Sequence, residues 1–291
     1  MPSASHPPAL LRIVERSLRE ECGLAAGDRL LLAVSGGGDS TALLHVMAQL
    51  APRFGLGLYA HGVDHGLRVE ASAELDLVAG HARDFGVEFS RTQVQVEHGS
   101  NLQSRAREAR YAALQARAYE LGGALIVTAH HADDRAETVM IRLLRGAGVA
   151  GLGVLPARAG QRVRPMIRAR RSDIHSHLER HELAFATDPS NRNQHYLRVR
   201  VRQVILPALC ECSPALVEHL CALADEAVAR RVASGEGEQS QCIETSRMGK
   251  RQSLALARAI ELGQVGFELP LRKGLLLRLE RDLRHPAAHL K

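Results

Sequence analysis

Aromatic residues and lysine are both scarce in this chain of 291 residues. Aromatic residues make up 3% of the chain and Trp is absent, which argues against a surface on which successive bases of a single strand stack. The basic residues are almost all arginine, since the only lysines are Lys250, Lys273 and Lys291. Arginine binds phosphate through paired hydrogen bonds, so the net charge of +6 favours a polyanionic partner such as nucleic acid.

Paired cysteines and long apolar runs are also missing. The five cysteines are Cys22, Cys210, Cys212, Cys221 and Cys242, and none of them forms a CxxC pair. An odd number without pair spacing excludes a disulfide framework and predicts reduced thiols in a cytoplasmic protein. No apolar run approaches the length that crosses a bilayer, and residues 1–16 lack the apolar core of a signal peptide. We therefore expect no membrane partner.

Apolar runs of strand type alternate with helical periods through the first two thirds of the chain. Strands are predicted over 29–34, 56–65, 87–96 and 124–131, and helices over 39–50, 70–86, 101–122, 133–148 and 172–182. Ser172 is the predicted N-cap of the last of these helices. The alternation predicts an α/β fold, a parallel sheet with helices on both faces in a Rossmann-like arrangement. We expect residues 1–206 to form this domain and residues 207–291 to form a small, mainly helical C-terminal region.

The sequence SGGGDS connects the first predicted strand to the first predicted helix of this alternation. It comprises Ser35, Gly36, Gly37, Gly38, Asp39 and Ser40. The glycines allow positive φ and let backbone N–H groups approach an anion, and the helix start favours negative charge. A Walker loop would carry a lysine; an aspartate in its place predicts a Mg²⁺ ion between the Asp39 carboxylate and phosphates. The alternative is an ordinary glycine-rich turn.

The sequence HHADDRAET follows the fourth predicted strand, so it reaches the same edge of the sheet as SGGGDS. Asp133 and Asp134 lie four and three residues before Glu137, so the three carboxylates are predicted to share a helix face. Capping accounts for one of them, and three favour a cation or a substrate amine. His130 and His131 could be metal ligands, acid–base groups or polar rim residues. Zinc is the less favoured of these, because no third ligand follows at zinc-site spacing.

The stretch AVSGGGDSTALL resembles the PP-loop of the ATP pyrophosphatase superfamily, whose members adenylate a carbonyl oxygen. Within that superfamily, the chain resembles the tRNA(Ile)-lysidine synthase family over roughly residues 29–207. The motifs that carry the resemblance are SGGGDS, HGLR (65–68), AREARY (106–111), TAHHADDRAET (128–138), LLRGAGVAGL (143–152), RPMI (164–167) and DPSN (188–191). The PP-loop alone indicates the superfamily, whereas the ordered set is specific to the family.

The resemblance implies a ligase that joins free lysine to C2 of the wobble cytidine of tRNA(Ile) with a CAU anticodon. It implies that ATP binds at residues 35–40 and is split into AMP and pyrophosphate, with Mg²⁺ held partly by Asp39. It also implies that Asp134 and Glu137 hold the lysine ammonium. Asp39, Asp134 and Glu137 are therefore the candidate catalytic residues, with Asp134 as the candidate general base.

Two arginine pairs belong to the same resemblance. Arg107 and Arg110 in AREARY, and Arg198 and Arg202 in LRVRVR, are implied contacts to ATP or to the tRNA backbone, and solvated helix faces are the alternative. Three positions depart from the family pattern, namely Gln103, Thr187 and Val199. They bear on tRNA coupling and not on adenylation. The C-terminal region is a further candidate for tRNA binding.

Two other functions stay open. A tRNA thiolase of the same superfamily would need paired cysteines for a persulfide or an iron–sulfur cluster, and no cysteine lies near either motif in the sequence. A nucleotide-binding regulatory module without catalysis is compatible with the departures at Gln103 and Val199. Pyrophosphate release that depends on tRNA would separate this module from a ligase. The sequence does not indicate the oligomeric state.

Overall fold

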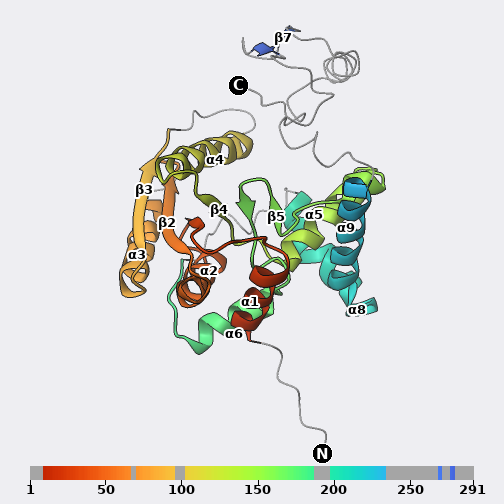
Figure 1. Cartoon of the computed structure of the whole chain (residues 1–291). Coiled ribbons are helices and arrows are strands. Elements are labelled where there is room, and N and C mark those ends of the chain that lie inside the picture. Colours follow the sequence, from red (N-terminus) through yellow and green to blue (C-terminus); the bar gives the residue numbers. More distant parts are fainter. Residues whose placement is uncertain are drawn as a thin grey trace, which may run out of the picture. The chain divides into compact units, whose positions relative to one another are not determined.

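The computed structural model describes residues 9–66, 70–95, 102–186 and 197–233, together with two short strands at 268–270 and 276–278 (Figure 1). The chain divides into two compact units, residues 1–230 and residues 231–291. Thr187 and the DPSN sequence lie outside the described residues, so the expectations attached to them stay predictions.

A six-stranded sheet forms the centre of the first unit. Its strands are β1 (Arg29–Val34), β2 (Gly57–Asp64), β3 (Glu88–Gln93), β4 (Leu125–Val127), β5 (Arg158–Ala159) and β6 (Arg162–Val163). The order is β3-β2-β1-β4-β6-β5, and neighbouring strands are parallel except for β5 and β6. The chain runs outward from β1 through β2 to β3 and then returns to the other side of β1 with β4. Ligands bind in such sheets beyond the carboxyl ends of the strands where the order reverses, here β1 and β4.

Helices cover both faces of the sheet (Figure 1). They are α1 (Leu10–Glu20), α2 (Gly38–Leu50), α3 (Glu70–Asp84), α4 (Leu102–Glu120), α5 (Ala132–Leu144) and α6 (Arg171–Arg180), with 3-10 turns η1 (Ala51–Phe54) and η2 (Val149–Leu152). In β1, Leu30 and Leu32 belong to the core shared with α1, α2, α3 and α6, whereas Leu31 belongs to the core shared with α4. This alternation follows the two-residue period of a strand, and burial on both faces explains the continuous apolar run. The predicted fold class is confirmed.

A helical group packs on α5. It consists of α7 (Leu197–Arg200), the π-helix η4 (Val201–Ile205), α8 (Leu206–Cys212) and α9 (Leu216–Ala233). Val201 and Leu220 share a core with Val139 of α5, so the expected boundary between residues 206 and 207 lies inside the first unit. Pro207 has no N–H to donate one turn back, which favours the wider turn before α8.

Apart from the last residues of α9, the described residues of the second unit form two strands, β7 (Glu268–Pro270) and β8 (Leu276–Arg278), which pair antiparallel. The helical pattern expected in this part of the chain does not predict them. Among the described residues, no single helix is long and apolar enough to cross a membrane; the segments Leu197–Cys212 and Leu216–Ala233, which meet at 101°, pass that test only as a pair, by length and composition.

The N-cap predicted for α6 is wrong. Helix α6 begins at Arg171, so Ser172 lies inside it and is not the N-cap. The carboxylate of Asp173 instead accepts a hydrogen bond from the N–H of Arg170, at 2.8 Å.

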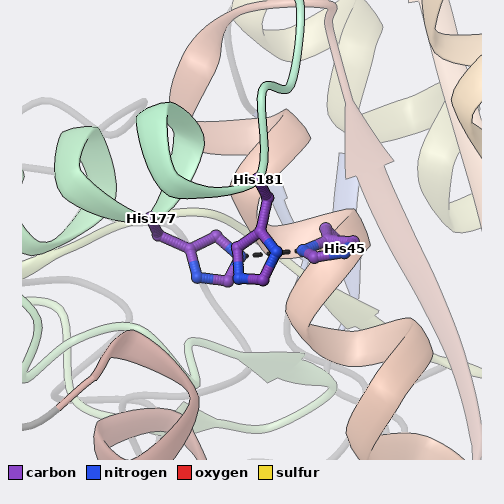
Figure 2. A group of neighbouring side chains, drawn as sticks. All are labelled: His45, His177 and His181. Carbon is purple, nitrogen blue, oxygen red and sulfur yellow. Dashed lines mark hydrogen bonds between the residues drawn. The ribbon is translucent and has the colours of Figure 1, made fainter.

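Helix α6 contacts α2, and the rings of His177 and His181 lie beside that of His45 (Figure 2).

Candidate active site

The loop between β1 and α2 depends on two of its three glycines for different reasons. Gly36 has a φ of +84°, and a Cβ at this position would lie 2.8 Å from the carbonyl oxygen of Glu74. Gly38 begins α2, and a Cβ there would lie 3.1 Å from Cδ1 of Leu178. Of the three glycines that allow positive φ in this loop, only Gly36 adopts it. Gly38 serves the close approach of α6.

Serine side chains close the loop from within. The N–H of Ser35 donates to Oγ of Ser40 at 3.2 Å, and this hydroxyl donates to the carbonyl oxygen of Gly37 at 2.9 Å. The N-cap of α2 is Gly37, which has no side chain to accept from the first N–H groups of the helix. Those donors, together with the helix dipole, are able to bind an anion. The loop of residues 35–40 therefore has the geometry of a phosphate-binding site at the carboxyl end of β1, and we call it the phosphate seat.

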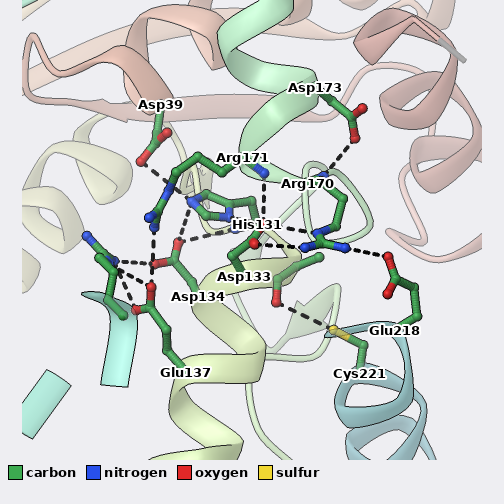
Figure 3. A network of polar contacts seen from close by, with 12 residues as sticks. Asp39, His131, Asp133, Asp134, Glu137, Arg170, Arg171, Asp173, Glu218 and Cys221 are labelled. Atoms are coloured by element: carbon green, nitrogen blue, oxygen red, sulfur yellow. Dashed lines mark hydrogen bonds and ion pairs between the residues drawn. The ribbon is translucent and has the colours of Figure 1, made fainter. Parts of the chain in front are cut away.

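His131 joins this loop to the start of α5 (Figure 3). Its ring is fully buried, and its Nε2 lies 3.7 Å from the Asp39 carboxylate and 3.4 Å from that of Asp134. Its Nδ1 lies 3.5 Å from the carboxylate of Asp133. Burial opposes the charged ring, but the surrounding carboxylates of Asp133, Asp39 and Asp134 raise the pKa of His131 to about 9. At neutral pH an imidazolium thus bridges the two motifs.

Asp134 and Glu137 are held by arginines from the helical group. Arg198 donates to Asp134 and to Glu137, both at 3.0 Å, and Arg202 donates to Asp134 at 3.1 Å and to Glu137 at 2.6 Å. The side chain of Glu137 is 1% exposed. The two arginines share a helix face as expected, but that face points at carboxylates. Arg171 adds a third guanidinium, 3.3 Å from Glu137, and nothing in its sequence context marks it.

Asp133 does not join this pair of carboxylates. It accepts a hydrogen bond from the N–H of Arg171 at 2.7 Å and contacts the guanidinium of Arg170 at 3.3 Å (Figure 3). Burial raises its pKa, but the nearby His131 ring and the hydrogen bond from the N–H of Arg171 hold the pKa of Asp133 well below its usual range. Arg170 also pairs with Glu218 of α9 at 2.6 Å. The Asp133 carboxylate therefore fixes the start of α6, and the expected face of three carboxylates is reduced to two.

His130 is directed elsewhere. Its Nδ1 lies 2.8 Å from the hydroxyl of Thr128, and burial lowers the pKa of His130 to about 4. The ring is therefore neutral at pH 7. Of the two adjacent histidines, only His131 contacts the carboxylates of both motifs.

Arginines also gather around Tyr111 of α4. The guanidinium carbons of Arg107, Arg110 and Arg162 lie 5.1, 5.7 and 4.8 Å from the centre of its ring. Burial lowers the pKa of Arg110. The aromatic ring attracts these guanidiniums, and their combined charge creates a positive potential that suits an anion.

The oxygen donors near His131 fit Mg²⁺. The side chain of Asp39 is 47% exposed and lies in the first turn of α2, and Asp134 lies across the same imidazole nitrogen. Mg²⁺ is typically held by one or two carboxylates together with substrate phosphates and waters. Asp39 is the accessible carboxylate of this pair and the natural ligand beside a phosphate seat.

Comparison with known proteins identifies the family. Residues 10–209 match the family described as a PP-loop domain. The chain belongs to this PP-loop family. Membership implies that it binds ATP, and the resemblance based on the motifs is confirmed.

Curated relatives carry a more specific name. A tRNA(Ile)-lysidine synthase from Novosphingobium aromaticivorans is 43% identical over 184 residues, which cover 61% of this chain and 56% of that protein. One of the same name from Symbiobacterium thermophilum is 39% identical over 229 residues, covering 75% and 47%. The chain thus spans about half the length of these curated relatives.

A solved structure shares the fold. The U34-tRNA thiolase NcsA from Methanococcus maripaludis superposes with a TM-score of 0.63 over 75% of this chain and 77% of its own, at 18% identity. This likeness concerns the fold alone.

Proposed function

We propose that the chain is a tRNA(Ile)-lysidine synthase, an ATP-dependent ligase that joins lysine to C2 of the wobble cytidine of tRNA(Ile) with a CAU anticodon. The observation that carries the proposal is the bridge at His131, where carboxylates of the phosphate loop and of α5 lie 3.7 and 3.4 Å from one nitrogen. A phosphate seat and buried carboxylates thus form one site. A reaction that handles both a triphosphate and an amine needs both parts.

In the first step, O2 of the cytidine attacks the α-phosphate of ATP, and the bond to the β-phosphate breaks so that pyrophosphate leaves. The N–H groups at the start of α2 hold the departing phosphates. Asp39 would hold Mg²⁺, and the ion, when bound, would offset the phosphate charge. Arg107 and Arg110, gathered at Tyr111, are positioned to bind phosphates of ATP or of the tRNA backbone. The residues of the chain contribute chiefly position and charge.

In the second step, the lysine amine attacks the activated C2 and AMP leaves. Asp134 and Glu137 hold the substrate ammonium in place of the guanidiniums of Arg198 and Arg202. These guanidiniums would then be free to bind RNA phosphate, which couples substrate entry to tRNA binding. Burial raises the pKa of Asp134, but the charges of His131 and Arg198 lower it more. Departure of Arg198 would raise this pKa and make Asp134 a better general base.

Incorporation of lysine into RNA tests the proposal. The protein is incubated with ATP, radiolabelled lysine and bulk tRNA, and labelled RNA is expected only when all three are present. Pyrophosphate release that depends on tRNA, without labelled RNA, would contradict the choice of lysine. No tRNA-dependent pyrophosphate release would favour the regulatory module.

The thiolase alternative makes a different demand on the cysteines. Cys221 lies nearer to the site than its sequence position indicates, because its thiol donates to the carbonyl oxygen of Ala132 at 3.5 Å (Figure 3). It is buried, and burial raises its pKa to about 11, so it is not a reactive thiolate. Cys22 is also buried, with its pKa raised to about 11.

We predict that a variant with all five cysteines changed to serine keeps its ligase activity, provided that it folds. The reason is that the buried thiols fill space and do no chemistry. Activity is measured as labelled RNA, and folding is measured by circular dichroism and thermal unfolding. A well-folded variant without activity would favour sulfur transfer, as in the thiolase.

Two further parts of the proposal concern the whole chain. The reduced cysteines support a cytoplasmic location. Residues 207–291 stay a candidate for tRNA binding.

A further inference from the structure

Three histidines converge between α2 and α6, apart from the candidate active site. We propose that His45, His177 and His181 form a binding site for a divalent transition metal ion, with Zn²⁺ as the ion of choice. One ring nitrogen of each lies within 4.8 Å of those of the others (Figure 2). His45 comes from α2, and the other two come from the last turn of α6 and the residue that follows it.

The spacing of these residues suits a metal. His177 and His181 are four residues apart, so they extend from one face of a helix, as the two histidines of helical zinc motifs do. Their ring centres lie 4.5 Å apart, and that of His45 lies 5.0 and 4.7 Å from them. Zinc–nitrogen bonds of about 2.0–2.1 Å place the nitrogens of a tetrahedral site about 3.3 Å apart. Because His181 is exposed, its ring is free to make this adjustment.

A hydrogen bond explains only two of the three rings. Nδ1 of His45 lies 2.8 Å from Nε2 of His177, which accounts for that pair. This bond does not explain why the ring of His181 lies against both of the others. A metal ion would explain it, because three imidazoles with water in the fourth position are a common set of zinc ligands.

A neighbouring side chain is placed to orient one of the three rings for a metal. The amide of Gln49 lies 3.0 Å from Nε2 of His45, and with its oxygen turned to that nitrogen it would orient the ring as an outer partner.

The donor set separates this site from the candidate Mg²⁺ site. Three imidazoles select ions such as Zn²⁺, whereas Mg²⁺ prefers oxygen ligands. His45 lies six residues after Asp39 on the same helix, about 9 Å along its axis. A metal here would tie α2 to α6, and the start of α6 contacts Asp133 and Glu137 through Arg171. It would therefore fix α2, which carries Asp39, relative to α6, which carries Arg171.

Metal binding to the full-length chain tests the proposal without ATP or tRNA, so its outcome is independent of the proposed function. Metal-free protein is titrated with Zn²⁺ against a chromogenic chelator. We expect one tight equivalent in the native chain, and an affinity at least about 100-fold weaker after His181→Ala, which removes a ligand outright. His175→Ala is the matched control, because His175 is an exposed histidine of the same helix and lies outside the cluster. Millimolar Mg²⁺ should not compete.

Three further measurements test the ligands and the binding. Co²⁺ in place of Zn²⁺ should give a tetrahedral spectrum without a thiolate charge-transfer band. His45→Phe, which keeps a ring against Phe85, should also lose the equivalent. Zn²⁺ should raise the unfolding temperature of the native chain and of His175→Ala, on the order of 5 °C at saturation, and not that of His181→Ala. Absence of a tight equivalent, equal affinity in His181→Ala, or a thiolate band would overturn the proposal.

Discussion

Asp39→Ala is expected to reduce tRNA-dependent pyrophosphate release by at least about 100-fold, the order of loss when a group that stabilises transition-state charge is removed. Asp39 is the exposed carboxylate at the phosphate seat, with its side chain 47% accessible. Its removal takes a ligand from the magnesium ion and a partner from the His131 imidazolium. Pyrophosphate is measured in the presence of ATP and tRNA, at increasing concentrations of Mg²⁺.

Two variants show whether the effect belongs to this carboxylate. Asp39→Asn keeps the size of the side chain and removes its charge, so it should lose nearly as much activity. Asp76→Ala removes an exposed aspartate of α3, which pairs with Arg91 at 2.8 Å, and should leave pyrophosphate release unchanged. Near-normal turnover of Asp39→Ala at saturating Mg²⁺ would rule out the metal role of Asp39.

Glu137→Gln should raise the lysine concentration needed for half-maximal activity about tenfold to a hundredfold, since a charge-assisted hydrogen bond contributes roughly 1.5–3 kcal/mol. The concentration of ATP that is required should change little, because Glu137 lies on α5 and not in the loop of residues 35–40. The change also leaves the guanidiniums of Arg171, Arg198 and Arg202 beside a neutral amide. Thermal unfolding must therefore be measured alongside the kinetics.

Asp133→Asn is the matched control for this loss of stability. Asp133 belongs to the same first turn of α5, but its carboxylate fixes the backbone of Arg171. We expect this variant to unfold at a lower temperature and to keep the native lysine requirement at a temperature where it is folded. An unchanged lysine requirement in Glu137→Gln would contradict the substrate-binding role. If Glu137→Gln impairs ATP consumption more than it impairs the use of lysine, the result would assign Glu137 to the magnesium ion instead.

The sequence predicted that both motifs lie at one edge of the sheet, because strand and helix periods place each of them after a strand of the same parallel sheet. It did not predict the partner of each side chain. Asp133 and Glu137 have the spacing of one helix face, yet Asp133 is drawn to the N–H of Arg171, which only the packing of α6 brings within reach. Arg198 and Arg202 do share a face, but periodicity cannot tell a face that meets RNA from one that meets buried carboxylates.

Local signals failed where tertiary contacts decided the outcome. Ser172 is a good N-cap by residue type, but the carboxylate of Asp173 already satisfies the N–H of Arg170, so α6 begins one residue earlier. Glycine is typical of left-handed backbone, but Gly38 lies in a helix. A small residue is needed there because the side chain of Leu178 packs close to it. The two-residue strand β5 is too short to leave a period in the sequence.

The π-turn η4 holds one extra residue between α7 and α8. Arg198 lies before the turn and reaches the α5 carboxylates, while Leu206, directly after it, is buried in the helical core. Each residue advances an α-helix by about 100°, and a π-turn accommodates one residue more than an α-turn. Because the wider turn takes up the extra residue, loss of a single residue from 201–205 would restore an ordinary helix and leave Arg198 and Leu206 facing their partners. In alignments of related chains, single-residue gaps in this helical stretch should therefore fall within this segment and not in the helices on either side.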